Sequence, residues 1–439
     1  MRSSFPASIP VLLIAALASA ADAPDGWPRW RGPNDDGMAR GDAPLQWSDR
    51  EHIAWKAEVP GRGNSSPVVW GDRIFLTTAV PTGNAPAVTP SNPDPAPAGR
   101  RDARGGPQAE HRFAVLAYDR KTGKLLWDKT ARVATPHEGH HATYGSFASN
   151  SPVADSRHVI AFFGSRGAYC YTHDGQLVWE KDFGPLRMFN GFGEGAWPAL
   201  DGNTLVLLFD HEDDSFLVAL DKNTGRELWR SPRPPGTSWA GPLIASVGGR
   251  KQAIVSATKF AAGYDLENGK LIWRATGLGR NTIPAPVVAD GTAFVMSGYQ
   301  QPNLLAIRLG GEGDLTGTDA ILWQNQRGNS YTASPVLHDG KLYVLTDSGM
   351  LSCFDSKTGK PYYHQERLPK PYNFKASPVG ANGKLYLASE AGDVIVVRMG
   401  EKFEVLATNT LEEQVFIATP AILDGEVYLR GQNTLFSIR

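Results

Sequence analysis

Residues 117–127 read A-Y-D-R-K-T-G-K-L-L-W, and the phrase returns as A-L-D-K-N-T-G-R-E-L-W at residues 219–229 and as G-Y-D-L-E-N-G-K-L-I-W at residues 263–273. Strands that open in Ser-Pro-Val or a close variant recur in step with it, and their prolines are Pro67, Pro152, Pro198, Pro242, Pro286, Pro335, Pro378 and Pro420. After the first interval, successive prolines lie 42 to 49 residues apart. A period of this length with several short strands per unit predicts a β-propeller.

The repeat predicts eight units of four strands each. In unit six the strands are expected at residues 334–337, 341–346, 351–354 and 361–364, separated by Gly-containing turns. The last unit stops after three strands, and residues 52–59 carry an outer-strand Trp with no strands before them. We therefore predict an all-β fold, an eight-bladed propeller of four-stranded antiparallel blades, with the ring closed by residues 52–59.

The N-terminal region has the pattern of an export signal. Residues 1–20 carry one charged side chain, an apolar run at 11–18, and the small residues Ala18, Ser19 and Ala20. We expect a signal peptide and an exported protein, periplasmic or extracellular. The apolar run is too short to span a bilayer, and no cysteine lies nearby to carry a lipid anchor.

Two further segments stand apart from the repeat. Residues 21–51 are expected to pack on the outside of the ring. Residues 80–110 are rich in Pro, Ala and Gly and lengthen unit one, so we expect a flexible insertion there. The propeller itself then covers residues 52–439.

Charge argues against a nucleic-acid-binding protein, and the positions of the two cysteines argue against a disulfide. The chain has 44 basic and 45 acidic side chains, which lacks the basic excess of nucleic-acid binders. Cys170 and Cys353 take equivalent places in units two and six, on opposite sides of the ring, beyond the reach of a disulfide. We predict two buried free thiols and a monomer.

An aromatic residue follows the Gly of the phrase by four positions in most units. It is Trp127, Trp179, Trp229, Trp273 and Trp323, with Tyr363 in unit six and Leu406 in unit seven. An aromatic side chain on the outer strand is expected to pack into the neighbouring blade and bury a large apolar area. These residues are therefore predicted to be structural.

The phrase A-x-D-x-x-T-G-x-x-x-W resembles the tryptophan-docking repeat of the pyrroloquinoline quinone (PQQ) propeller superfamily, over about residues 52–439. One branch, the quinoprotein alcohol dehydrogenases, holds PQQ and calcium on the propeller axis. Another is the propeller subunit of the outer-membrane β-barrel assembly machinery, a cofactor-free scaffold of similar length. The segment W-P-R-W-R-G-P at 27–33 is similar to the opening of secreted PQQ-repeat proteins of unassigned activity.

The chain departs from both branches. It has no adjacent cysteine pair of the dehydrogenase type, and it lacks the lipid-bearing cysteine of the assembly subunit. Our leading hypothesis is a non-catalytic scaffold that binds protein partners of the cell envelope and needs no cofactor. The alternatives are a PQQ- or metal-dependent oxidoreductase of quinoprotein type, using PQQ with calcium, and binding of a polysaccharide or small ligand at the channel mouth.

The residues just ahead of each inner strand are expected to surround one mouth of the channel. Aromatic, Arg and Asn side chains on a concave surface are typical of a ligand or partner site. The candidates are Arg62, Asn64, Tyr144, Asn150, Glu194, Trp239, Arg280, Asn281, Arg327, Asn329, Tyr331, Phe374 and Lys375. Arg327 and Lys375 with Trp239 are the side chains expected to face an anionic quinone.

Two local motifs have metal-binding composition. His137-Glu138-Gly139-His140-His141 matches H-E-x-x-H, but a zinc protease needs this motif on a helix, and Pro136 and Gly139 disfavour one. A surface metal site of His137, His140 and His141, or a polar loop, are the alternatives left. Residues 310–319 carry three carboxylates, so they form either a calcium loop or an expanded turn.

Overall fold

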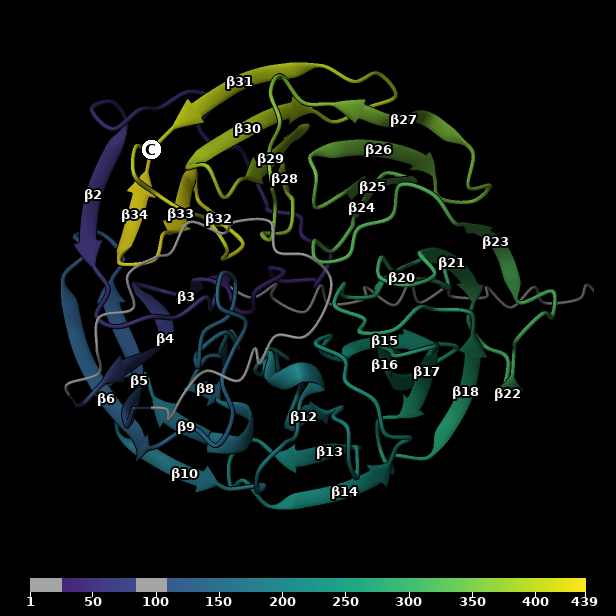
Figure 1. Cartoon of the computed structure of the whole chain (residues 1–439), viewed down its shortest axis with the longest axis horizontal. Helices are drawn as coiled ribbons and strands as arrows, with labels where there is room; N and C mark the ends of the chain where they lie inside the picture. Colours follow the sequence, from purple (N-terminus) through teal and green to yellow (C-terminus); the bar gives the residue numbers. More distant parts are fainter. Residues whose placement is uncertain (1–25, 84–108) are drawn as a thin grey trace, which may run out of the picture.

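The recurring prolines directly precede the innermost strand of each blade, and the repeated phrase, where it occurs, joins the two outer strands. The structure is a computed structural model that describes residues 26–83 and 109–439. In these ranges eight antiparallel sheets stand around a central axis (Figure 1). The predicted fold is confirmed. The predicted signal peptide and most of the predicted insertion lie outside the described residues.

The strands of the first four blades run from the channel outward in chain order. Blade one has β3 (Val68–Trp70), β4 (Arg73–Pro81), β5 (His111–Asp119) and β6 (Leu125–Ala134), and blade two has β7 (Val153–Ala154), β8 (His158–Phe162), β9 (Ala168–Thr172) and β10 (Leu177–Lys181). Blade three has β11 (Ala199–Asp201), β12 (Thr204–Phe209), β13 (Phe216–Asp221) and β14 (Glu227–Pro232). Blade four has β15 (Leu243–Val247), β16 (Arg250–Ala257), β17 (Phe260–Asp265) and β18 (Leu271–Thr276).

The remaining blades follow the same order. Blade five has β19 (Val287–Ala289), β20 (Thr292–Ser297), β21 (Asn303–Arg308) and β23 (Ile321–Asn325), and blade six has β24 (Val336–His338), β25 (Lys341–Leu345), β26 (Met350–Asp355) and β27 (Pro361–Arg367). Blade seven has β28 (Val379–Ala381), β29 (Lys384–Ala388), β30 (Asp393–Arg398) and β31 (Val405–Thr410). Blade eight has β32 (Ala421–Leu423), β33 (Glu426–Arg430) and β34 (Thr434–Ile438).

The outer strand of blade eight comes from the other end of the chain. β2 (Ile53–Glu58) pairs antiparallel with β34, with Trp55 opposite Ser437. The predicted closing strand at 52–59 is therefore confirmed. Closure removes the edge that a three-stranded blade would leave exposed.

Tryptophan docking joins blades eight, one, two, three and five each to the blade that follows it. The indole N–H of Trp127 donates to the carbonyl of His173 at 2.8 Å, in the turn between the outer strands of blade two. Equivalent bonds, of 2.7 to 3.0 Å, run from Trp55 to Arg120, Trp179 to Lys222, Trp229 to Leu266, and Trp323 to Ser356. The predicted structural role of these residues is confirmed.

Blade four does not dock its tryptophan on blade five, because blade five has an expanded turn at the docking position. Trp273 is fully buried and donates to the Gln252 side chain of its own blade at 2.6 Å. Blade five lacks the short turn that would receive the indole; there β22 (Gly313–Asp314) runs parallel to β18 and covers its edge. Gly263 replaces the alanine of the phrase because a Cβ would overlap the Trp273 ring.

Two acidic side chains of the same expanded turn form ion pairs with arginines. Glu312 pairs with Arg250 at 2.9 Å and Asp319 pairs with Arg308 at 2.7 Å, so these carboxylates face different arginines. Within residues 26–83 and 109–439, no group of three acidic, His or Cys side chains is placed to hold a metal ion. These two carboxylates of the expanded turn therefore pair with separate arginines.

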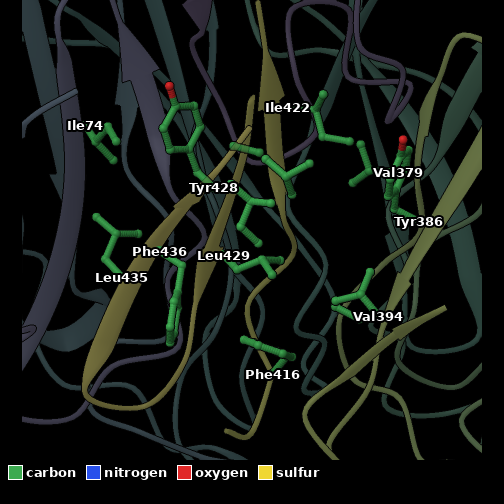
Figure 2. Packing of buried hydrophobic residues seen from close by; sticks show 14 of the residues in the cluster. Ile74, Val379, Tyr386, Val394, Phe416, Ile422, Tyr428, Leu429, Leu435 and Phe436 are labelled. Atoms are coloured by element: carbon green, nitrogen blue, oxygen red, sulfur yellow. The ribbon is translucent and has the colours of Figure 1, made fainter. Parts of the chain in front are cut away.

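Apolar side chains fill the spaces between neighbouring blades. Figure 2 shows one such cluster, in which Ile74 of blade one lies near Leu435 of blade eight, and Ile422 lies toward Val379 of blade seven. Burial of such side chains is the main favourable contribution to folding. Cys170 and Cys353 lie in two different clusters, both buried and free, as predicted.

The prediction that residues 21–51 pack on the outside of the ring is wrong for the part that enters the channel. β1 (Gly26–Trp27) pairs with the innermost strand of blade one, Gly26 opposite Trp70. The buried Arg31 then donates to the carbonyls of Pro335 at 2.6 Å and Pro378 at 2.9 Å, in blades six and seven. The segment therefore crosses the channel, because its Arg satisfies carbonyls at the inner edge of the ring.

The described residues contain no helix that is both long and apolar enough to cross a membrane.

Candidate functional site

A cavity of about 520 Å³ occupies the channel where the loops enter the inner strands. All eight blades and the N-terminal segment contribute to it. Its lining includes Trp30, Asn64, Ser66, His141, Tyr144, Ser151, Phe189, Phe192, Glu194, Trp197, Trp239, Asn281, Tyr299, Tyr331, Lys375, Ser377 and Thr419. Aromatic rings and polar side chains thus line one concave site, and small-ligand pockets combine these two kinds of group.

The structure brings together seven of the predicted mouth residues. Those that line the cavity are Asn64, Tyr144, Glu194, Trp239, Asn281, Tyr331 and Lys375. The six that lie elsewhere are Arg62, Asn150, Arg280, Arg327, Asn329 and Phe374. A binding role for any of them remains a prediction.

The six others have local roles or point to solvent. Asn150 is buried and its amide donates to the carbonyl of Ala196 at 2.5 Å, while Phe374 is fully buried among apolar neighbours. Asn329 bonds to the backbone of Asn325 at 2.8 Å within one turn, beside the exposed Arg327. Arg62 donates to Thr143 at 3.2 Å, and Arg280 is exposed. The pairing of Arg327 with Lys375 and Trp239 is thus not formed.

Hydroxyl groups of neighbouring inner strands surround much of the channel, and we name this set of residues the hydroxyl belt. The residue before the opening proline accepts a hydrogen bond from the backbone N–H of the equivalent residue one blade earlier. The acceptors are Ser334 from Ala285 (2.8 Å), Ser377 from Ser334 (2.9 Å), Thr419 from Ser377 (3.0 Å), Ser66 from Thr419 (3.0 Å) and Ser151 from Ser66 (2.8 Å). The Ser-Pro opening therefore encodes the contact between inner strands.

The belt is interrupted where the cavity becomes aromatic. Blades three, four and five carry Trp197, Gly241 and Ala285 at the belt position. A Cβ at Gly241 would lie 2.5 Å from the Trp197 ring, so glycine gives that ring its place. Trp197 packs on Trp30 with ring centroids 4.4 Å apart. The sequence analysis did not identify Trp30 or the hydroxyl belt as parts of the site. The recurring Ser-Pro pairs were the sequence pattern from which the belt could have been predicted.

The one lysine among the lining residues is neutralised by neighbouring carboxylates. Lys375 lies 2.9 Å from Asp347 and 3.8 Å from Glu390, and its ammonium stands 4.4 Å from the centroid of the Tyr144 ring. Asp347 also accepts from the backbone of Tyr331 at 3.0 Å. Lys375 thus belongs to an existing ion cluster.

Burial disfavours the charged forms of Glu194 and His141, which also line the cavity. Burial raises the pKa of the Glu194 carboxyl, although it accepts from the backbone and the hydroxyl of Ser165, both at 2.5 Å. Burial lowers the pKa of His141, whose ring stacks on Tyr144 at 4.9 Å. Among the described lining residues, no hydrogen bond joins Glu194, His141 and Lys375 into a nucleophile–base pair.

The predicted histidine metal site is not formed. His137 contacts the carbonyl of Leu186 at 2.6 Å and the Arg166 guanidinium at 3.0 Å. His140 faces the carbonyl of His141 at 3.0 Å and packs edge-on against Phe147. The segment is not helical, so the rings do not share a face, and the zinc-protease motif has no structural basis in this loop.

The charges of the lining residues do not fit PQQ, the quinone cofactor found in other propellers of this fold class. PQQ is a tricarboxylate, whereas the one lining lysine is already paired with two carboxylates. Calcium requires several convergent oxygen ligands, and the described part of the chain offers no cluster of three acidic side chains. The donor set fits an uncharged ligand better than this anion.

Eight four-stranded blades, tryptophan docking between them and an axial cavity define an eight-bladed propeller of the PQQ-repeat class. The sequence model of the family described as "Outer membrane protein assembly factor BamB" matches residues 111–365 and 314–400. The chain belongs to this family.

Individual relatives are distant. The outer membrane protein assembly factor BamB of Yersinia pestis is 23% identical over 289 residues, which cover 59% of this chain and 63% of that protein. The chain thus spans about three fifths of the length of this curated relative.

Two solved structures show the likeness of fold. The crystal structure of BamB from Moraxella catarrhalis matches with a TM-score of 0.53 at 12% identity, over 75% of this chain and 94% of that one. Quinohemoprotein alcohol dehydrogenase from Comamonas testosteroni matches with a TM-score of 0.64 at 10% identity, over 95% and 81%. At these identities the likeness concerns the fold alone.

Proposed function

We propose that this chain is a non-catalytic scaffold of the cell envelope that binds protein partners in the assembly of outer membrane proteins. The observation that carries the proposal is the family match over residues 111–365 and 314–400. The proposal includes export through the signal peptide expected at residues 1–20 and function as a monomer without cofactor.

The chemistry of the channel supports binding over catalysis. The acidic and the lysine side chains of the lining already have partners, Glu194 with Ser165 and Lys375 with Asp347. A catalytic site would need a reactive group within reach of a base or acid, with a perturbed pKa suited to that role. The cavity instead presents aromatic rings and hydroxyl groups.

The outer strands of blades one and two offer a surface for a protein partner. Large apolar side chains are exposed there on β6 and β10, which Figure 1 shows at the rim of the ring. They are Leu125, Leu126, Val133, Leu177 and Val178, each with 40 to 52% of its surface exposed. We propose that they form one contact surface, since contiguous exposed apolar area marks interaction surfaces. We name these five residues the rim patch.

Affinity co-purification from envelope extracts tests the proposal. The tagged full-length chain, produced in its source organism, is expected to recover outer membrane proteins or their assembly factors reproducibly. Leu126→Lys should reduce that recovery about tenfold, because a charge at a buried contact costs at least ~1.4 kcal/mol.

Leu271→Lys supplies the matched control. Leu271 is 54% exposed on β18, an outer strand whose edge β22 already covers, so the same change there should leave recovery unaltered. Recovery of no envelope protein above an untagged control would contradict the proposed function. Equal losses in both variants would contradict the assignment of the rim patch.

A further inference from the structure

The hydroxyl belt places four hydroxyl groups on the wall of the cavity. Ser66, Ser151, Ser377 and Thr419 all line it, and each hydroxyl oxygen accepts one backbone N–H. Among residues 26–83 and 109–439, none of these four hydroxyls donates to another protein group. A hydroxyl carries one donor as well as acceptor lone pairs, so the four donors remain available to oxygen atoms inside the channel.

Aromatic rings stand across the channel from these donors. In a ring of eight blades, Trp197 of blade three lies opposite Ser377 of blade seven, and Trp239 of blade four lies opposite Thr419 of blade eight. Trp239 is fixed by its bond to the carbonyl of Gly193 at 2.7 Å. One side of the cavity therefore offers flat apolar faces and the other side offers hydroxyl donors.

The lining amides add polar groups of the same uncharged kind. Asn64 donates to the carbonyl of Tyr144 at 2.7 Å, which leaves its side-chain oxygen as an acceptor. Asn281 lines the cavity in a left-handed backbone conformation (φ 55°). Since Lys375 is neutralised by Asp347, the cavity disfavours a ligand with net charge.

We propose that the channel cavity binds a neutral saccharide, one or two sugar rings in size. A pyranose has an apolar face of C–H groups that stacks on aromatic rings and a rim of oxygens that accept from hydroxyl and amide donors. The volume of about 520 Å³ lies in the range of small-ligand sites. This site is separate from the rim patch, so either assignment can fail without the other.

The test uses the full mature chain on an array of neutral oligosaccharides built from hexoses, pentoses and N-acetylhexosamines. The strongest saccharide is then titrated calorimetrically, with tryptophan fluorescence as a second signal. We expect binding by at least one neutral saccharide, and a fluorescence change because Trp197 and Trp239 contact it. Ser377→Ala should weaken binding about two- to tenfold, the effect of one hydrogen bond.

Ser334→Ala is the matched control. Ser334 accepts the same type of belt hydrogen bond, from Ala285 at 2.8 Å, but does not line the cavity. Both variants should lose similar thermal stability, and only Ser377→Ala should lose affinity. Silence of the array would overturn the proposal, and so would equal loss of affinity in the two variants. Preferential binding of acidic saccharides would overturn it as well.

Discussion

At the scale of single residues, the glycine of the repeated phrase sets how closely two blades approach. Gly123 has a φ of +71°, and Asp119 supports its turn by accepting the backbone N–H of Thr122 at 2.8 Å. A Cβ on Gly123 would lie 2.5 Å from the Trp55 ring. Asp, Gly and Trp of the phrase therefore act together. The Asp stabilises the turn, the Gly leaves space above it, and the Trp of one blade packs on the Gly of the next.

Gly123→Ala is expected to lower the free energy of unfolding by more than the cost of placing alanine in a left-handed backbone conformation. Gly383 has nearly the same φ, +72°, but has open space around its Cβ position, so Gly383→Ala measures the backbone cost. The steric overlap with Trp55 should add about 1–3 kcal/mol to the free energy lost. Urea unfolding of both variants gives the difference, and equal losses would refute the packing role.

Glu194 makes stability depend on pH. Burial raises its pKa above the ordinary value of 4.5, so the folded protein keeps a proton that the unfolded chain releases. The stabilisation from this group is complete below the unfolded pKa and is lost as the pH rises through the folded pKa. Compared with Glu194→Gln, the unaltered protein should therefore lose stability on going from acidic to neutral pH.

Urea unfolding across that pH range measures the difference. Glu404→Gln is the comparison, since Arg398 beside it holds the pKa of Glu404 below its usual range and the dependence has the opposite sign. A difference between unaltered protein and Glu194→Gln that does not change with pH would show that Glu194 is not buried as described.

At the scale of elements, the closing strand holds the ring together. Without β2, blade eight would expose the edge of β34, which can pair with another chain. A chain that begins at residue 60 is expected to self-associate, whereas one that begins at residue 52 keeps β2 and should stay monomeric. Size-exclusion chromatography with light scattering distinguishes them, and two monomers of equal melting temperature would contradict this role.

The strands and their order follow from local patterns and could be predicted. This includes β2, because Trp55 marks an outer strand with no inner strands before it, and the last unit lacks an outer strand. The path of residues 26–38 could not be predicted, since Arg31 finds its acceptors at Pro335 and Pro378, which are distant in sequence. The cavity was predictable only in part. Neighbours such as Phe374 and Lys375 point to opposite sides, and composition alone does not say which faces the channel.

At the scale of the whole molecule, the closed ring carries two separate surfaces. The rim patch lies on the outer strands of blades one and two, and the cavity lies on the axis. Membership in the assembly-factor family supports use of the ring as a scaffold. The fold is shared with quinohemoprotein dehydrogenases, so the lining residues and not the fold must decide between binding and redox chemistry.

Thermal unfolding of the protein with PQQ and calcium, together and separately, tests most directly the central claim that the channel binds no quinone cofactor. One site at a hundred times its Kd would add about 2.7 kcal/mol of stability, which a melting curve resolves. Because Lys375 is already paired and the described chain has no acidic cluster for calcium, we predict an unchanged melting temperature. A rise that requires both additives would contradict the scaffold account and identify a quinoprotein.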